Sequence, residues 1–293
     1  MRLVLATRRS PLALAQTGTV AEALRAHGHE VELLPVVTTG DRRSREGRLP
    51  GAGDEVKGLF VKELEEALLA GDADAAVHSA KDLPTELPAG LAVVAVPERV
   101  DPRDVAIGPA GGLDALPAGA RVGTGSPRRQ AQLADGWPGL VPVDIRGNVD
   151  TRIGKMARGD VDALLLAHAG LIRLGGDTPP VVPLDPAVFV PAPGQGCLAL
   201  EARADRGDVA EALACIDHGP SRRALAAERA FLAELGGGCQ TPVGALCVEE
   251  EGAVTVTGHV GVAGGPGRRG VETGEAVRAE DVARVLARRL GAP

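Results

Sequence analysis

Aromatic side chains are almost absent from this chain of 293 residues, which has no Tyr, one Trp and three Phe, or 1% in all. Hydrophobic residues still make up 44% of the chain, so its interior must be built from Ala, Val and Leu rather than from large rings. The scarcity of rings argues against nucleic-acid binding by base stacking. The net charge of −7 argues the same way, because phosphate binding depends on an excess of Lys and Arg.

Long apolar runs and metal-ligand spacings are lacking too. No stretch reaches the roughly 18 apolar residues of a membrane span, and arginines rather than a cleavage site follow the short N-terminal apolar run. The four cysteines form no C-x-x-C pair, and the six histidines do not have zinc-ligand spacing. We therefore expect a cytoplasmic protein without a metal. Its thiols should be free, with Cys197, Cys215 and Cys247 as packing residues in apolar contexts.

Lysine is rare, since four Lys stand against 28 Arg. Three of the four, Lys57, Lys62 and Lys81, fall within 25 residues of one another. An ammonium is a compact point charge and a guanidinium is a planar fork, so the two are not interchangeable. This grouping indicates that a compact cation is needed in that region.

Two stretches of the chain show the same order of signals. Residues 3–6 predict a buried strand, Ser10 a helix cap, and Pro11 the first turn of a helix that continues to about Arg25. A predicted strand at 121–125 leads to SPRRQAQ (126–132), which matches SPLALAQ (10–16) at four of seven positions. Later, GDADA (71–75) and GDVDA (159–163) precede apolar runs typical of buried parallel strands. The repetition predicts two related α/β lobes with a ligand cleft between them.

Chain crossings between the lobes are expected near 96–104 and near 190–196, where VPAPGQG is rich in Pro and Gly. We assign residues 1–96 with 197–217 to a first lobe, 97–196 to a second, and 218–293 to a small α+β C-terminal domain. In that domain we expect Ser221 to cap a helix ending at Leu235, strands near 243–248 and 254–260, and a last helix at 279–290. The charged, glycine-rich segment 40–56 predicts a mobile lid.

Cations accompany both predicted helix caps: two arginines precede Ser10, and two follow Ser126. A helix N-terminus offers free amide groups and the positive end of a dipole, so both caps are candidate carboxylate or phosphate sites. The segment IRGNVDTRIGK (145–155) adds Arg146, Arg152 and Lys155. A solvated basic face explains any one of these arginines. The whole set favours a ligand that bears several carboxylates.

Two residues are candidates for chemistry. Asp82 follows a predicted strand end in HSAKDLP, and it is either a solvated charge or a carboxylate that stabilises positive charge and moves a proton. Cys239 follows three glycines, so it is either an accessible nucleophile or an incidental residue of a turn. His78 and His168 follow apolar runs, and for both a packed structural role is favoured over that of a base.

Several long segments, taken together, resemble the porphobilinogen deaminase family, also called hydroxymethylbilane synthases, over about residues 2–246. They include KDLP (81–84), GSPRRQ (125–130), IRGNVDTRIGKM (145–156) and GGGCQTP (236–242). The resemblance implies an α/β fold with two lobes like those of periplasmic binding proteins, joined by hinges, and a third domain that carries the cofactor. It implies a dipyrromethane cofactor, built from two substrate units and held by a thioether to Cys239.

The implied activity is that of a transferase in tetrapyrrole biosynthesis. Porphobilinogen loses ammonia to give an electrophilic pyrrole, and four molecules are joined head to tail and released by water as hydroxymethylbilane. Asp82 matches the catalytic carboxylate, and Phe60 matches an aromatic near the pyrroles. The other matches are expected to bind cofactor or substrate: Arg8, Ser10, Lys57, Lys81, Thr124, Ser126, Arg128, Arg129, Arg146, Asn148, Arg152, Arg173 and Gln195.

The resemblance further implies a monomer whose partner is the small molecule porphobilinogen, with no nucleic acid and no membrane. Two positions depart from the expected pattern. Pro127 stands where many relatives are expected to have Leu, and Asp150 stands near Arg152 where a small residue is common. Asp150 is expected to weaken carboxylate binding locally.

Two other classes compete with this interpretation. A two-lobed binding or sensing module has the same cleft and hinges, but it has no use for Cys239 on a glycine loop. A nucleic-acid protein is suggested by RRSREGR and SPRRQ, and is opposed by the acidity and the lack of aromatics. A covalently attached pyrrole pair separates the enzyme from both.

Overall fold

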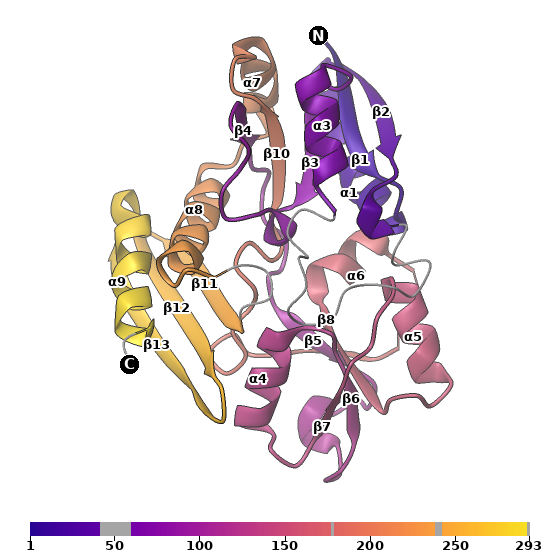
Figure 1. The fold of residues 1–293 in the computed structure, drawn as a ribbon, viewed down its shortest axis with the longest axis vertical. Coiled ribbons are helices and arrows are strands. Elements are labelled where there is room, and N and C mark those ends of the chain that lie inside the picture. Colours follow the sequence, from indigo (N-terminus) through magenta and orange to yellow (C-terminus); the bar gives the residue numbers. More distant parts are fainter. Residues whose placement is uncertain (42–59, 177–178, 238–241, 292–293) are drawn as a thin grey trace.

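The computed structural model describes residues 1–41, 60–176, 179–237 and 242–291, which form three sheets with helices packed against them (Figure 1). Of the predicted lid at 40–56, only residues 40 and 41 lie within these ranges. Two predicted site residues, Lys57 and Cys239, lie outside them. No helix within the described ranges is long and apolar enough to span a membrane.

The first lobe is built on a five-stranded sheet with the order β2-β1-β3-β10-β4. Its strands are β1 (Arg2–Arg8), β2 (Glu30–Val36), β3 (Ala75–Ser79), β4 (Leu91–Ala95) and β10 (Leu198–Arg203). Strand β1 is parallel to β2 and β3, and β10 is antiparallel to β3 and β4. Helices α1 (Pro11–Ala26) and α7 (Gly207–Leu213) bury apolar side chains on one face, and α3 (Lys62–Ala70) does so on the other.

The second lobe has a five-stranded sheet with the order β7-β6-β8-β5-β9. Its strands are β5 (Asp104–Ile107), β6 (Arg121–Gly123), β7 (Val141–Val143), β8 (Ala163–Ala167) and β9 (Val181–Pro183). Helix α4 (Pro127–Gly136) packs on one face, while α5 (Val149–Ala157) and α6 (His168–Leu174) pack on the other.

The two sheets have the same plan. In each, four strands run in one direction, and the strand in the fourth position is antiparallel to both of its neighbours: β10 in the first lobe and β5 in the second. The chain passes from the first lobe to β5 through residues 96–103, the first crossing segment. It returns from the second lobe to β10 through residues 184–197, the second crossing segment. The prediction of two related α/β lobes from short sequence echoes is therefore confirmed.

The C-terminal domain is a three-stranded antiparallel sheet with two helices on one face. Its elements are α8 (Gly219–Glu234), β11 (Val243–Glu250), β12 (Ala253–Val262), β13 (Gly265–Glu275) and α9 (Ala279–Gly291). Figure 1 shows α8 lying between this sheet and the first lobe. Short 3-10 turns occur at Ala80–Asp82 (η1), Gly112–Ala115 (η2), Ala214–Ile216 (η3) and Ala276–Arg278 (η4).

One expectation about this domain is wrong. Helix α8 begins at Gly219 with His218 as its N-cap, not with Ser221. Pro220 fits the first turn, where a backbone N–H has no helical partner, so the helix starts before Ser221. The Ser221 hydroxyl instead accepts a hydrogen bond from the backbone N of Arg99 at 2.9 Å. Ser221 therefore joins the first crossing segment to α8.

Candidate active site

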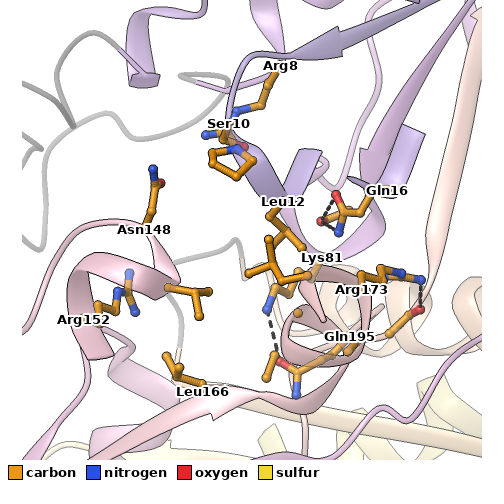
Figure 2. Close-up of a pocket in the computed structure, with 18 of the residues that line it drawn as sticks. Arg8, Ser10, Leu12, Gln16, Lys81, Asn148, Arg152, Leu166, Arg173 and Gln195 are labelled. Atoms are coloured by element: carbon orange, nitrogen blue, oxygen red, sulfur yellow. Dashed lines mark hydrogen bonds between the residues drawn. The ribbon is translucent and has the colours of Figure 1, made fainter. Parts of the chain in front are cut away.

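A cavity of about 350 Å³ lies between the two lobes (Figure 2). Its lining comes from the β1–α1 turn, η1, the N-terminal half of α5, α6 and the second crossing segment. Most of the predicted binding residues that the structure describes meet here: Arg8, Ser10, Lys81, Arg129, Asn148, Arg152, Arg173 and Gln195. Five of these side chains are cationic, so a ligand with several negative charges suits this cavity.

The two predicted helix caps are confirmed. Ser10 Oγ accepts a hydrogen bond from the backbone N of Ala13 at 3.2 Å, and Ser126 Oγ accepts one from Arg129 N at 3.5 Å. A proline follows each cap in the first turn. Ser10 lines the cavity, so the start of α1 presents its free amide groups there.

Arg8 is held at the mouth of the cavity by two neighbours. Its Nη2 donates to Oδ1 of Asp41 at 2.6 Å, and its guanidinium lies 4.2 Å from the centre of the Phe60 ring. A guanidinium over a ring face is attracted by the ring's quadrupole. Burial raises the pKa of Asp41, but the hydrogen bond and charge of Arg8 outweigh burial and lower that pKa overall. Phe60 thus acts on the cavity through Arg8.

Arg128 and Arg129 share one buried carboxylate, that of Asp104 at the start of β5. Arg128 Nη1 lies 2.6 Å from Asp104 Oδ2, and Arg129 Nη2 lies 2.7 Å from Oδ1. Burial raises the pKa of Asp104, but the two guanidiniums outweigh burial and lower it. All three groups are buried. One carboxylate between two guanidiniums leaves an excess positive charge beside the cavity, which Arg129 lines and Arg128 does not.

Lys81 lines the cavity from η1, and its Nζ donates to Oε1 of Gln195 at 3.3 Å. Burial and, to a smaller extent, the charge of Arg129 lower the pKa of Lys81, while Asp82 raises it in part, and the net pKa is about 8. A lysine whose charge is destabilised in this way gains from a bound anion.

The pKa values of Arg152 and Arg173 are lowered as well. Burial lowers the pKa of each to about 10, and for Arg152 the charges of Arg129 and Arg146 add to the effect. Backbone carbonyls hold both side chains in place: Arg152 Nε donates to Gly147 O at 2.7 Å, and Arg173 Nη2 donates to Gly196 O at 2.8 Å. Both guanidiniums stay charged at neutral pH, so the second lobe attracts anionic ligands to the cavity through α5 and α6.

Several predicted residues lie beside the cavity without lining it. Asp82 is exposed at the end of η1, next to Lys81. Thr124 is fully buried, and its Oγ1 accepts a hydrogen bond from Ser126 N at 3.2 Å. Arg146 pairs with Asp144 at 3.0 Å. Their binding and catalytic roles remain predictions.

Three residues of the site were not singled out from the sequence. Gln16 and Ser79 line the cavity, and Gln16 Nε2 donates to Ser79 Oγ at 2.8 Å. Asp104 is the third. Gln16 and Gln132 occupy the same place in the repeated SPxxxAQ pattern. Gln132 holds the backbone of Val190, accepting from its N at 2.7 Å and donating to its O at 2.9 Å. The repeat therefore contained a usable signal for Gln16.

The histidines and cysteines considered in the sequence have different surroundings in the structure. His78 lies 3.0 Å from buried Glu201, and His168 Nδ1 lies 2.9 Å from Asp101 Oδ2, which agrees with packed structural roles. Burial raises the pKa of both Cys197 and Cys247 to about 12, so these thiols are inert. Cys215 was expected to be a packing residue, which is wrong.

The correction at Cys215 has a local cause. Cys215 lies in η3 after the short helix α7, and its side chain is exposed. The core neighbours there are Val209 and Leu213, which turn toward the first sheet. In the described part of the chain, no group of three or more His, Cys, Asp or Glu side chains is arranged to hold a metal ion.

These features define a class of protein: a two-lobed α/β protein whose inter-lobe cavity suits a polycarboxylate. Comparison with known proteins is more specific. Residues 3–211 match the family model described as porphobilinogen deaminase, dipyromethane cofactor binding domain, and residues 223–292 match that of the porphobilinogen deaminase C-terminal domain. The chain belongs to the porphobilinogen deaminase family.

Individual relatives agree with the family models. The chain is 49% identical over 277 residues to a porphobilinogen deaminase of Roseiflexus sp. (strain RS-1), covering 94% of this chain and 90% of that protein. It is 48% identical over 294 residues to one of Rubrobacter xylanophilus, covering 99% and 93%. Among solved structures, the methionine binding protein MetQ is 15% identical with a TM-score of 0.42, covering 75% of this chain and 92% of that chain.

The residues present fit the cofactor that this family carries. Two pyrroles, each with an acetate and a propionate, bring four carboxylates. The cavity offers five cationic side chains, from Arg8, Lys81, Arg129, Arg152 and Arg173. Its volume of about 350 Å³ falls within the range of small-molecule sites. Burial lowers the pKa values of Lys81, Arg152 and Arg173, so carboxylates bound beside them would stabilise their charged forms.

Proposed function

We propose that this inter-lobe cavity is where the chain, as a transferase of tetrapyrrole biosynthesis, deaminates porphobilinogen and joins four molecules head to tail into hydroxymethylbilane, with release of ammonia. The observation that carries this proposal is the convergence of five cations from both lobes on one cavity, in a chain with a net charge of −7. The family membership supports it, because this family polymerises a substrate with two carboxylates per unit.

Cys239 is the proposed anchor of the dipyrromethane, through a thioether. When bound, the cofactor supplies the free pyrrole α-carbon to which the first substrate is joined. Support comes from the sequence GGGCQTP and from the state of the other thiols. Cys197 and Cys247 are buried with raised pKa values, and Cys215 lies in η3 of the first lobe. Cys239 is the remaining candidate among the four cysteines.

Asp82 is the proposed catalytic carboxylate. It is exposed beside the cavity-lining Lys81, at the end of β3 and η1. There its negative charge can stabilise the positive charge that develops on a substrate pyrrole as ammonia leaves, and its oxygen can take up a proton from the ring carbon. The charge of Asp82 raises the pKa of Lys81 and so favours the ammonium form of that lysine.

The carboxylates of cofactor and substrate are assigned to the cations and caps of the two lobes. Arg8, Ser10 and Lys81 act from the first lobe, with Lys57 as a further candidate. The second lobe contributes Thr124, Ser126, Arg128, Arg129, Arg146, Asn148, Arg152 and Arg173, and the second crossing contributes Gln195. Phe60 acts by holding the guanidinium of Arg8.

The proposal includes the domain bounds, the location and the partners of the protein. We assign residues 1–96 with 197–217 to the first lobe, 97–196 to the second, and 218–293 to the C-terminal domain, and the three sheets support this division. We expect a cytoplasmic monomer that acts on a small molecule and binds neither nucleic acid nor membrane. The low aromatic content and the negative net charge support the exclusion of nucleic acid.

The decisive experiment is the intact mass of the denatured protein, purified from a host that makes porphobilinogen. Wild type should carry an adduct of two pyrrole units and should colour with Ehrlich's reagent. Cys239→Ala should show the bare polypeptide mass, and Cys215→Ala, the matched control at an exposed thiol, should keep the adduct. A bare mass for freshly purified wild type would contradict the covalent cofactor and favour a two-lobed binding protein.

A further inference from the structure

The loop that follows Asp82 is fastened to a helix of a different domain. The Nη2 atom of Arg229, on α8 of the C-terminal domain, donates to the backbone O of Pro84 at 2.8 Å and to that of Thr85 at 2.9 Å. Two carbonyls of the loop are thus held by one guanidinium. Because Arg229 is planar and has several donors in a fixed arrangement, it sets the orientation of the loop as well as its distance from α8.

A third hydrogen bond joins the same loop to the end of α8. Thr85 Oγ1 donates to the backbone O of Gly237 at 3.1 Å. Gly237 is also held through its own N, which donates to Leu232 O at 3.1 Å, while Gly236 N donates to Ala233 O at 2.9 Å. Gly236 has a φ of +63°, so this is a Schellman ending of the helix, for which glycine is the suitable residue. Gly237 is therefore fixed on both sides, by α8 and by Thr85.

Apolar packing holds the loop against the same helix. Leu83, the residue after Asp82, is buried in one cluster with Leu225 of α8. Leu225 and Arg229 are four residues apart, so they share one face of α8. That single face contacts the loop through Leu83, Pro84 and Thr85 in succession.

These contacts link two chemically important points of the chain. Asp82 lies three residues before Thr85, and Cys239 lies two residues after Gly237. We propose that Thr85 and Arg229 are positioning residues: they fix the catalytic loop that bears Asp82 against the start of the loop that bears the cofactor cysteine. This inference rests on the roles proposed for Asp82 and Cys239.

The expected effect is on rate more than on stability. A single neutral hydrogen bond contributes only modestly to folding, and the loop is also held to α8 by the packing of Leu83 on Leu225 and by the two hydrogen bonds of Arg229. Catalysis is more sensitive, because a misplacement of about 1 Å between reacting groups can lower a rate by about a hundredfold. The loss of the Thr85 bond should thus lower kcat while leaving the carboxylate-binding cations, and so KM, nearly unchanged.

The test compares Thr85→Val with Thr85→Ser in the holoenzyme. Valine keeps the shape and removes the donor, and serine keeps the donor. We expect Thr85→Val to retain the two-pyrrole mass, to have a KM within about twofold of wild type, and to lose about tenfold or more in kcat. Thr85→Ser should restore kcat to near the wild-type value. Thr19→Val is the matched control. Thr19 is exposed on α1, and its Oγ1 also donates to a backbone carbonyl, that of Ala15, at 3.1 Å.

A second readout does not depend on turnover. Hydrogen–deuterium exchange followed by mass spectrometry should show faster exchange in Thr85→Val in two separate peptides, one containing residues 82–86 and one containing Gly237. Peptides from α1 and α4 should exchange as in wild type. Arg229→Met should accelerate exchange in the same loop peptide. If Arg229→Met does not fold, Thr85→Val alone carries the test.

The outcomes separate this inference from the function on which it rests. If wild type carries no pyrrole adduct, the proposed function fails before Thr85 is considered. If wild type carries the adduct and turns over porphobilinogen, unchanged kcat in Thr85→Val overturns the positioning role alone. A Thr85→Ser variant as slow as Thr85→Val overturns it too, because packing of the methyl group rather than the hydrogen bond would then be responsible.

Discussion

Lys81 and Gln195 are joined by a hydrogen bond of 3.3 Å from Nζ to Oε1 that connects the first lobe to the second crossing segment. The amide of Gln195 can point in one direction only. Its Nε2 donates to Pro102 O at 2.8 Å and to Asp104 Oδ1 at 3.0 Å, and both partners are acceptors, so the oxygen is left for Lys81. Gln195 thereby ties the cavity lysine to the buried Arg128, Arg129 and Asp104 cluster.

The first prediction concerns the charge of Lys81 in protein without cofactor, the Cys239→Ala variant. The pKa of Lys81 is lowered from 10.5 to about 8, so between pH 8 and 10.5 the unfolded chain holds more protons than the folded one. The free energy of unfolding should therefore rise with pH across this window. Adding Lys81→Met should stabilise the variant at pH 7 by about 2 kcal/mol, less than the full shift implies because the ammonium is partly solvated.

Urea denaturation at pH 7, 8, 9 and 10 measures this effect. The stabilising effect of Lys81→Met should shrink steadily above pH 8. Lys62→Met, at an exposed lysine of α3, serves as the control and should show no such trend. A Lys81→Met variant that is less stable than its parent at pH 7 would show that the ammonium is net stabilising, against the prediction.

The second prediction concerns Asp104. Asp104→Asn removes the carboxylate from two buried guanidiniums, and breaking a buried ion pair by removing one partner costs about 3–5 kcal/mol. The loss of stability can be measured by denaturation followed through the fluorescence of Trp137, the one Trp of the chain. The Trp137 ring lies 6.1 Å from that of Phe189 in the core of the second lobe. Asp205→Asn, at an exposed pair with Arg203, should leave the denaturation midpoint where it is. Equal midpoints for the two variants would refute the role of Asp104.

The third prediction concerns His259, a buried residue of β12 whose Nε2 lies 3.0 Å from Oδ2 of Asp135 on α4. Burial lowers the pKa of His259 below 6.5; Asp135 raises it in part, and Arg269 and Arg128 lower it further. The unfolded chain therefore binds more protons as pH falls through 6.5 and below. Stability should decrease with acidity in this window.

His259→Gln should flatten the decrease, since glutamine can keep the hydrogen bond to Asp135 and does not titrate. The measurement is Tm between pH 5 and pH 8. His27→Gln, at an exposed histidine of the α1 C-cap, should retain the wild-type dependence. If His259→Gln shows the full wild-type slope, other groups account for the acid sensitivity.

The fourth prediction concerns catalysis. Asp82→Asn should keep the two-pyrrole adduct and a near-normal KM, while kcat should fall by about a hundredfold or more, as for the loss of a charged group that acts in the transition state. Glu86→Gln removes an exposed carboxylate from the same loop and should leave kcat close to that of wild type. Steady-state kinetics with porphobilinogen distinguish the two. A similar modest loss in both variants would place the catalytic carboxylate elsewhere.

Local signals in the sequence were sufficient wherever structure depends on neighbours along the chain. The Ser-Pro pairs predicted the starts of α1 and α4, because a cap and its proline act within one turn. Alternation and apolar runs predicted β11 and β12. Strand β13 was missed because GPGRRGVETGE has four glycines and little alternation. Two of these glycines, Gly270 and Gly274, make room for α9 side chains, a tertiary reason that no local pattern reveals.

The site was predicted less evenly. The family's motifs identified the cations that line the cavity, but they did not identify Asp104, the carboxylate that binds two of the neighbouring arginines. Asp104 lies 24 residues before Arg128 and 91 before Gln195, so its role depends on how β5 meets α4 and the second crossing. Burial of the Arg128 and Arg129 pair depends on the same meeting of elements. Such long-range neutralisation of charge becomes visible only in three dimensions.

The strand order of the first sheet also bears on how the chain is made. Among the described strands, β4 pairs with β10 alone, and β10 begins at residue 198, about a hundred residues after β4 ends. All five strands of the second sheet lie between residues 104 and 183. During synthesis from the N-terminus, the second lobe therefore has its complete set of strands first. The sheet of the N-terminal lobe can be completed only after β10, which ends at Arg203, has been synthesised.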